Sequence, residues 1–238
     1  MKTIVTTLIF SLTIAICQPV SAESLWKRIL RITGISATPS QQKGPGEEIV
    51  SGGMIWIGDP QAGTRRRVRD DGEFRSPIFA PNDSTIVALR AGWLWRMDVE
   101  TGKGAKLHHL STVTKLIGLD RDDPDKILVL RDENGKESPA LLSLQSGKLT
   151  DIPYDAQSSE DRALLNHLKG WERDYGQVAV YPMEQRRESI VGPMEWQDVF
   201  YKKGEAEPVN VSRCDGDNCG QPSLSSDGNK VAYIRVGR

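Results

Sequence analysis

Two cysteines near the end of the chain are close enough to form a disulfide. Cys214 and Cys219 flank the short segment Asp-Gly-Asp-Asn. A disulfide across so short a loop would fix that loop and stabilise the fold by about 2 kcal/mol. A zinc site would need two further ligands, and no second pair of cysteines or histidines lies nearby in the sequence. We therefore predict a disulfide between Cys214 and Cys219, which is typical of exported proteins.

Histidines and acidic turns give only weak signals for catalysis or metal binding. His108 and His109 are neighbours in an expected strand, so their side chains should point to opposite faces and cannot easily share a metal ion. The segment Asp120–Asp125 spaces carboxylates as calcium loops do, but it lacks the glycine and the distal glutamate of an EF-hand. Aspartate is also a common turn residue, and we favour a turn there.

The sequence lacks the short motifs that usually mark an enzyme. It contains no Gly-x-Ser-x-Gly nucleophile motif, no phosphate-binding loop and no dinucleotide-binding fingerprint. We therefore predict a protein that is not an enzyme and that uses no metal ion or cofactor.

Tryptophans offer a candidate binding surface. Trp93 and Trp95 are two positions apart, which places both rings on one face of a strand. Packing between structural units is the favoured explanation, because Trp56 occupies the same repeat position as Trp95. An exposed aromatic platform for a peptide or a sugar is the alternative. Trp93 and Trp95 are therefore candidate partner-binding residues.

An internal repeat supplies the strands that would position these residues. One kind of unit is a hairpin with a glycine in its polar turn, as tight turns often require. The other kind is a pair of strands that precedes the hairpin. The hairpins are Gly53–Val68, Gly92–Leu107, Pro139–Ile152 and, more weakly, Gln197–Ser212, and the pairs are Pro77–Leu89, Lys115–Leu130, Pro222–Ile234 and a partial copy at Gly176–Pro182.

The order of these units predicts a ring. The chain begins with a hairpin, continues with three repeats of pair and hairpin, and ends with a pair. Four-stranded units of about 40–50 residues are typical of propeller blades. The final pair, Gln221–Ile234, would be the inner half of a blade whose outer half is Met54–Val68. We therefore predict an all-β fold, a small β-propeller of about four blades of four antiparallel strands, closed by pairing of the N- and C-terminal strands.

Three segments carry a resemblance to a known repeat family. They are SPIFAPNDSTIVAL (Ser76–Leu89), LWRMDVETG (Leu94–Gly102) and QPSLSSDGNKVAYI (Gln221–Ile234). These segments resemble the PD40, or WD40-like, repeats of TolB-type propellers and of the propeller domain of prolyl-oligopeptidase-type peptidases. The resemblance covers most of Gly46–Arg238 and implies a propeller fold, with little indication of function.

The N-terminal residues predict export. Lys2 precedes an apolar stretch, Ile4–Ile16, and the tripeptide that ends at Ala22 fits the small-x-small pattern of a signal-peptide cleavage site. Cleavage after Ala22 is favoured over lipoprotein cleavage before Cys17 and over an uncleaved anchor. Residues 1–22 are therefore expected to be a signal peptide, and the mature protein to be periplasmic or secreted.

Two helices are expected. Residues 23–36 should form an amphipathic helix, with basic residues on its polar face, followed by a linker at 37–46. This helix could cap the propeller, dock on a partner or lie on a membrane surface, and these alternatives stay open. A second helix, Ser158–Gly176, should interrupt a blade where its innermost strand would lie. The candidate partner-binding residues of the first helix are Leu25, Trp26 and Ile29.

These observations together predict an exported scaffold. The net charge of −1 gives no overall field that would attract nucleic acid. We predict that residues 47–238 form a non-enzymatic propeller domain that binds a protein or peptide partner in the cell envelope, with peripheral membrane contact through Glu23–Ile35 as an open alternative. An accessory or remnant propeller of a peptidase or hydrolase system is the second hypothesis.

Overall fold

The structure is a computed structural model that describes residues 52–120, 122–170 and 172–237. The expected signal peptide (1–22), the expected helix (23–36) and the linker (37–46) lie outside the described residues. The candidate residues Leu25, Trp26 and Ile29 therefore lie outside them too.

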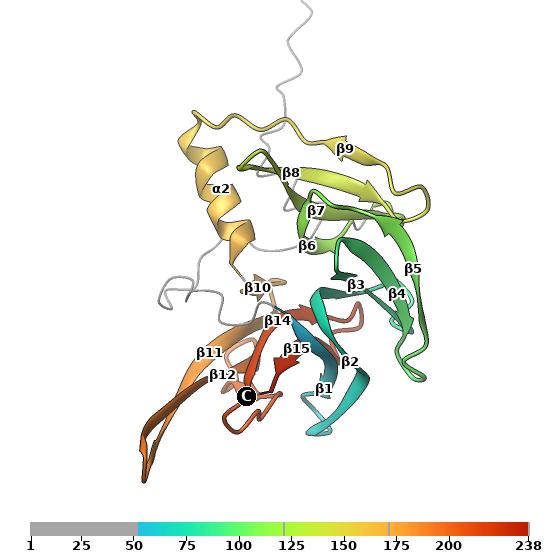
Figure 1. Ribbon diagram of the computed structural model, residues 1–238. Coiled ribbons are helices and arrows are strands. Elements are labelled where there is room, and N and C mark those ends of the chain that lie inside the picture. Colours follow the sequence, from blue (N-terminus) through green and yellow to red (C-terminus); the bar gives the residue numbers. More distant parts are fainter. Residues whose placement is uncertain (1–51, 121, 171, 238) are drawn as a thin grey trace, which may run out of the picture.

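Antiparallel sheets make up most of the described chain (Figure 1). One sheet has seven strands, and two others have four strands each. In spatial order, the seven strands are β14 (Asn218–Leu224), β15 (Val231–Val236), β1 (Gly53–Asp59), β2 (Thr64–Phe79), β3 (Thr85–Arg90), β4 (Trp93–Asp98) and β5 (Gly104–His109). The smaller sheets are β6 (Val113–Leu119), β7 (Lys126–Glu133), β8 (Lys136–Ser143) and β9 (Leu149–Asp151), and then β10 (Arg173–Asp174), β11 (Val178–Ser189), β12 (Gly192–Lys203) and β13 (Val209–Asn210).

The long strand β2 belongs to two four-stranded units. Its first half pairs with β1, from Asp59↔Thr64 inward, and its second half pairs with β3, as in Phe79↔Ile86. Between the halves the backbone is irregular, with positive φ angles of 74° at Glu73 and 50° at Ser76. These left-handed residues let one strand leave the first unit and enter the next. The seven-stranded sheet is thus two units joined by a shared strand.

The two ends of the described chain lie in one sheet, as the repeat pattern predicted. β15 pairs antiparallel with β1, from Met54↔Arg235 to Gly58↔Val231. This pairing is confirmed. The three sheets are nevertheless not joined into one hydrogen-bonded ring among the described strands. A closed ring of four blades therefore stays a prediction.

Buried apolar clusters link neighbouring sheets. Of the four clusters in the described residues, three combine residues of two units and one packs α2 on the β6–β9 sheet, so packing continues where the hydrogen-bonded ladders stop. Tyr175 packs against two of the clusters and so connects the helix side of the molecule to β12 and β15. Representative buried pairs that share a cluster are Ile55 with Met97, Leu94 with Val129, Leu128 with Leu168, and Tyr201 with Tyr233.

The expected second helix is present as α2 (Ser159–Lys169), but it ends at the C-cap Gly170 and not at the expected Gly176, since Arg173–Asp174 form the strand β10. The hydroxyl of its N-cap, Ser158, accepts a hydrogen bond from the backbone N–H of Asp161 at 3.3 Å. Leu164, Leu165 and Leu168 are buried against the β6–β9 sheet. Figure 1 shows α2 beside this sheet, on the way to β10. The helix and the two-residue β10 together stand where a full innermost strand would otherwise lie. None of the helices in the described part of the chain is long and apolar enough to cross a membrane.

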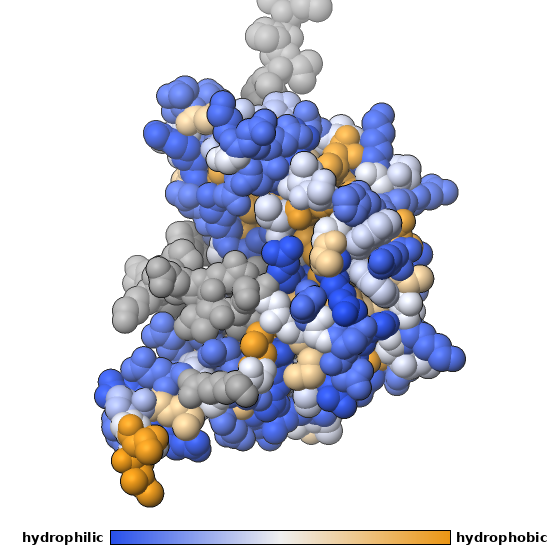
Figure 2. Space-filling view, in the orientation of Figure 1, coloured by the Kyte–Doolittle hydropathy of each residue, from blue (hydrophilic) through white to orange (hydrophobic). Residues whose placement is uncertain are grey.

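A two-stranded arm extends from the last unit. β11 and β12 pair over their whole length as far as Ser189↔Gly192, whereas β10 and β13 each pair with them at only two positions. The turn residues Ile190 and Val191 are fully exposed. Figure 2 shows apolar surface at the end of this arm, at the lower left of the view.

Candidate ligand-binding pocket

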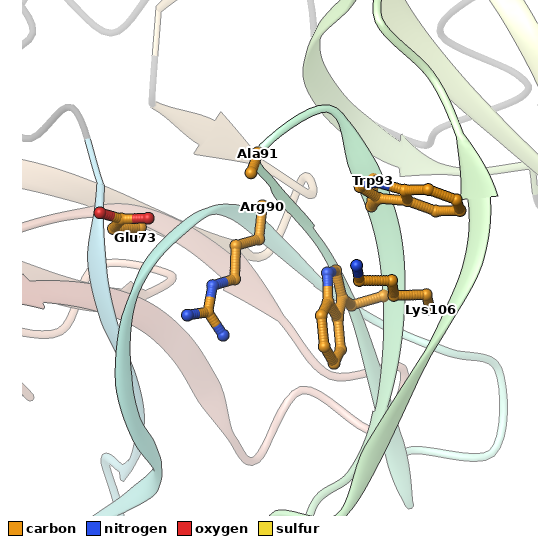
Figure 3. Close-up of a pocket in the computed structure, with 6 residues that line it drawn as sticks. Glu73, Arg90, Ala91, Trp93 and Lys106 are labelled. Carbon is orange, nitrogen blue, oxygen red and sulfur yellow. The ribbon is translucent and has the colours of Figure 1, made fainter.

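A pocket of about 400 Å³ opens at the turn between β3 and β4, next to the bend in β2 (Figure 3). Its walls come from three places in the sequence that the fold brings together. Glu73 comes from the bend, Arg90 and Ala91 from the turn, and Trp93 and Trp95 from β4. Lys106 on β5 completes the lining.

Local strand geometry places the aromatic walls. Ala91 and Gly92 both have positive φ angles, 48° and 74°, as the tightest hairpin turns require. Alternation along β4 then puts Trp93 and Trp95 on one face, where both line the pocket. Lys106 is the register partner of Trp95 on β5, so it reaches the same face. The prediction that the two tryptophans share a face agrees with this arrangement, and their role in binding stays a prediction.

A cluster of charges supports the floor of the pocket. The carboxylate of Asp71 accepts hydrogen bonds from Arg69, at 2.7 Å to Nη2, and from Arg90, at 2.6 Å to Nη1. The hydrogen bond from Arg69, reinforced by that from Arg90, holds the pKa of Asp71 below its usual value. Both guanidinium groups also lie over the ring of Trp95, at 5.3 Å and 5.7 Å from its centroid. Asp71 is therefore ionised at neutral pH and engaged by two arginines.

A second copy of this arrangement indicates that it is structural. Arg235 near the end of β15 occupies the position that matches Arg90 at the end of β3. Its guanidinium lies 5.0 Å from the ring centroid of Trp56. Its guanidinium also pairs with Asp217 at 2.7 Å. Trp56 and Arg235 thus repeat the relation between Trp95 and Arg90. A repeated residue that makes a repeated contact favours packing, as predicted for Trp95.

Trp93 differs from these repeated residues, whereas Lys106 matches Arg67, the register partner of Trp56 on β2. The position that matches Trp93 in the first hairpin is Met54, so this tryptophan is specific to the pocket. The Lys106 ammonium lies 4.8 Å from the ring centroid of Trp93 and 5.9 Å from that of Trp95. No carboxylate among the described residues forms an ion pair with Lys106. The ammonium group of Lys106 in the pocket wall therefore contacts aromatic rings and forms no ion pair with a described carboxylate.

Two further polar groups of the pocket have unused hydrogen-bonding capacity. The indole N–H of Trp95 is buried and has no hydrogen-bond acceptor in the described part of the chain. Glu73 makes no ion pair with any described residue. Figure 3 shows Glu73 on one side of Arg90 and Lys106 on the other. A bound molecule could thus meet an anion at one end of the pocket and a cation at the other.

The two neighbouring histidines point in different directions, as predicted. His109 packs edge-on against Trp93, with ring centroids 5.0 Å apart. The Nε2 atom of His108 lies 2.8 Å from the backbone oxygen of Leu144 in the next sheet. The geometry gives no shared metal site.

The aspartates of the acidic segment make the hydrogen bonds of a turn. Asp120 Oδ1 accepts hydrogen bonds from the backbone N–H groups of Asp122 and Asp123. Asp123 pairs with Lys126 at 2.6 Å, and that hydrogen bond lowers the pKa of Asp123. Within residues 52–237 as described, no cluster of three or more metal-binding side chains occurs. The turn interpretation accounts for these contacts.

The Cys214–Cys219 disulfide is confirmed, and both cysteines are buried. Beside it lies a polar centre that sequence reasoning missed. The buried carboxylate of Asp198 accepts a hydrogen bond from the backbone N–H of Cys214 at 2.6 Å. It also accepts hydrogen bonds from Trp196 Nε1 at 3.0 Å, Asn210 Nδ2 at 2.9 Å and Ser212 Oγ at 2.8 Å. This centre fixes the loop that the disulfide closes.

Comparison with known proteins identifies no family for this chain. No family model matches it, and no curated protein does. Among solved structures, the putative TolB from Agrobacterium tumefaciens is 15% identical, with a TM-score of 0.35 over 74% of this chain and 58% of that one. TolB from Acinetobacter baumannii is 12% identical, with a TM-score of 0.35 over 82% and 49%. The tricorn protease is 17% identical, with a TM-score of 0.35 over 77% and 17%.

These likenesses are limited in extent. The chain spans at most 58% of the length of these three proteins. TM-scores of 0.35 are too low to establish a shared fold. Strand pairing within the chain itself is what indicates four propeller-like units.

Proposed function

We propose that this protein is an exported, non-enzymatic β-propeller of four blades that binds a protein or peptide partner in the cell envelope. The pocket at Trp93 carries the proposal, because it combines two indole rings with a cation, Lys106, that has no ion-pair partner among the described residues. Aromatic side chains beside an unpaired charge are typical of sites that hold peptides by stacking and electrostatic attraction.

The propeller and export parts of the proposal have separate support. Four four-stranded units, and the pairing of β1 with β15, support a ring of four blades. The third and fourth units would be joined without a continuous hydrogen-bonded ladder, through α2, which packs on the β6–β9 sheet, and Tyr175, which packs against the clusters of both sides. The Cys214–Cys219 disulfide supports an oxidising compartment outside the cytoplasm.

Binding of an immobilised peptide array by the purified mature protein tests the proposal. We expect wild type to retain a subset of peptides with micromolar affinity. Trp93→Ala should weaken that retention by about tenfold or more, because it removes the half-buried ring that lines the pocket. Met54→Ala, at the matching repeat position outside the pocket, should retain the same peptides as wild type.

Two outcomes would overturn the proposal. One is that the wild-type protein retains no peptide above background. The other is hydrolysis of peptide or glycoside libraries that a single aspartate substitution abolishes, which would establish a hydrolase instead.

A further inference from the structure

The charge balance of the pocket selects the kind of ligand that it can hold. Two cations, Arg90 and Lys106, and one carboxylate, that of Glu73, line the pocket. Arg90 is already paired, because its guanidinium, like that of Arg69, donates a hydrogen bond to Asp71, which is not part of the lining. The ammonium group of the remaining cation, Lys106, is therefore free of an ion pair with any described residue and can pair with an anion of the ligand.

The position of Lys106 suits an anion that enters beside an apolar group. Contact with the Trp93 and Trp95 rings restricts the ammonium, so a bound anion would pair with a cation that is already positioned. A charge-assisted hydrogen bond from such an ammonium is a favourable partner for a carboxylate oxygen.

The opposite side of the pocket suits a hydrogen-bond donor. Glu73 has a φ angle of 74°, a left-handed conformation that residues other than glycine rarely adopt and that tends to occur at functional sites. Its carboxylate has no ion-pair partner in the described chain and can accept a hydrogen bond from a peptide N–H. A peptide would present this donor and a carboxylate within one or two residues of each other.

We propose that the pocket recognises a peptide carboxylate beside an apolar side chain, with Lys106 as its ion-pair partner and Trp93 as the surface for the apolar group. This inference rests on the peptide-binding function proposed above. The carboxylate can come from the C-terminus of the peptide or from an aspartate or glutamate side chain, and the same two groups of the pocket would hold either one.

Fluorescence anisotropy with three labelled peptides tests the inference and separates these sources. The peptides share one sequence that ends in phenylalanine: the first has a free C-terminal carboxylate, the second has a C-terminal amide, and the third has an amide with a glutamate before the phenylalanine. We expect the first or the third to bind wild type at least about tenfold more tightly than the second. The preferred peptide identifies the source of the carboxylate. Its affinity should fall as salt is added.

A matched pair of variants assigns the effect to the pocket. Lys106→Met should remove the preference for the carboxylate, so that acid and amide peptides bind alike. Lys103→Met, an exposed lysine on the turn before β5, should keep the preference. Near-ultraviolet circular dichroism checks that both variants fold as wild type does.

The failures of the two proposals are distinguishable. Equal affinity of wild type for acid and amide peptides would overturn carboxylate recognition and leave peptide binding in place. A carboxylate preference that persists in Lys106→Met would also overturn it. Absence of binding to all three peptides and to the peptide array would overturn both proposals.

Discussion

Two cations of one pocket, Arg90 and Lys106, have different surroundings. Arg90 pairs with Asp71 and lies over a ring, and Arg235 repeats both contacts in the neighbouring unit. Lys106 has ring contacts but no carboxylate partner among the described residues. The cation that matches Lys106 in the neighbouring unit is Arg67, which pairs with Asp70 at 3.9 Å. Lys106 therefore differs from both arginines in having no carboxylate partner in the described chain.

Asp198 is the residue whose loss should most disturb the disulfide loop. Replacing it with alanine would leave four donors without their acceptor, including the buried N–H of Cys214. We expect Asp198→Ala to lower the free energy of unfolding by about 3 kcal/mol or more, since each unsatisfied buried donor costs about 1–3 kcal/mol. Urea denaturation under non-reducing conditions measures this change.

Asp70→Ala is the matched control for that experiment. Asp70 is exposed and lies 3.9 Å from Arg67, so its removal should change stability by at most about 0.5 kcal/mol. Equal effects of the two substitutions would show that the Asp198 centre does not hold the loop.

At the residue scale, the sequence predicts contacts that depend on short spacing and misses those that depend on distant partners. The Cys214–Cys219 bond and the shared face of Trp93 and Trp95 follow from loop length and strand alternation. In the sequence, nothing distinguishes Asp198 from other polar residues of a strand. Its partners Asn210 and Cys214 come close to it only after the chain that follows β12 folds back. Lys106 became a candidate only when the structure showed which carboxylates lie near it.

Among the elements, the turns do more than reverse the chain. The β4–β5 turn packs against β2 of the preceding unit, so closely that a Cβ atom at Gly102 would lie 2.2 Å from the backbone oxygen of Val68. Gly135, in the β7–β8 turn, has a similar positive φ but no atom within 4 Å of the same position. These two glycines separate the cost of the backbone conformation from the cost of a clash.

We expect Gly135→Ala to destabilise the protein by about 1 kcal/mol, which is the penalty for a left-handed backbone. Gly102→Ala should cost about 3 kcal/mol or more, because the turn must also move away from β2. Thermal unfolding of the two variants compares these costs. Similar losses would contradict the close docking of the β4–β5 turn.

The positions of the elements were predictable where the strands are local and regular. The expected hairpins correspond to β1 with β2, β4 with β5, β8 with β9 and β12 with β13. The sequence did not reveal that β2 continues past its irregular segment Asp70–Glu73 into the next unit, because charged residues and a glycine there resemble a loop. Its continuity depends on pairing with β1 on one side and β3 on the other, which are contacts between units.

At the scale of the whole molecule, the order of the repeats predicted the largest feature. A chain that begins with an outer hairpin and ends with an inner pair can complete its sheet only if the two ends meet, and β15 does lie between β14 and β1. The arm of β11 and β12 was not predictable, because its exposed end has no buried face to impose a pattern. Alternation of apolar and polar residues arises from burial of one strand face, so it cannot predict a strand segment that extends away from the core.

The pairing of the two ends makes a prediction about cooperativity. Val231–Ile234 are fully buried in β15, which is an interior strand of the seven-stranded sheet. Ending the chain after Lys230 would expose the ladder edges of both β14 and β1 and remove apolar residues from two clusters. We expect this truncated chain to lose its cooperative thermal transition, because no remaining strand can replace β15.

Deleting only the last two residues should leave the transition within a few degrees of wild type, since Gly237 is exposed and makes no close contact at its Cβ position. A truncated chain that still melts cooperatively, with the near-ultraviolet circular dichroism of wild type, would show that the units fold independently of the joined ends.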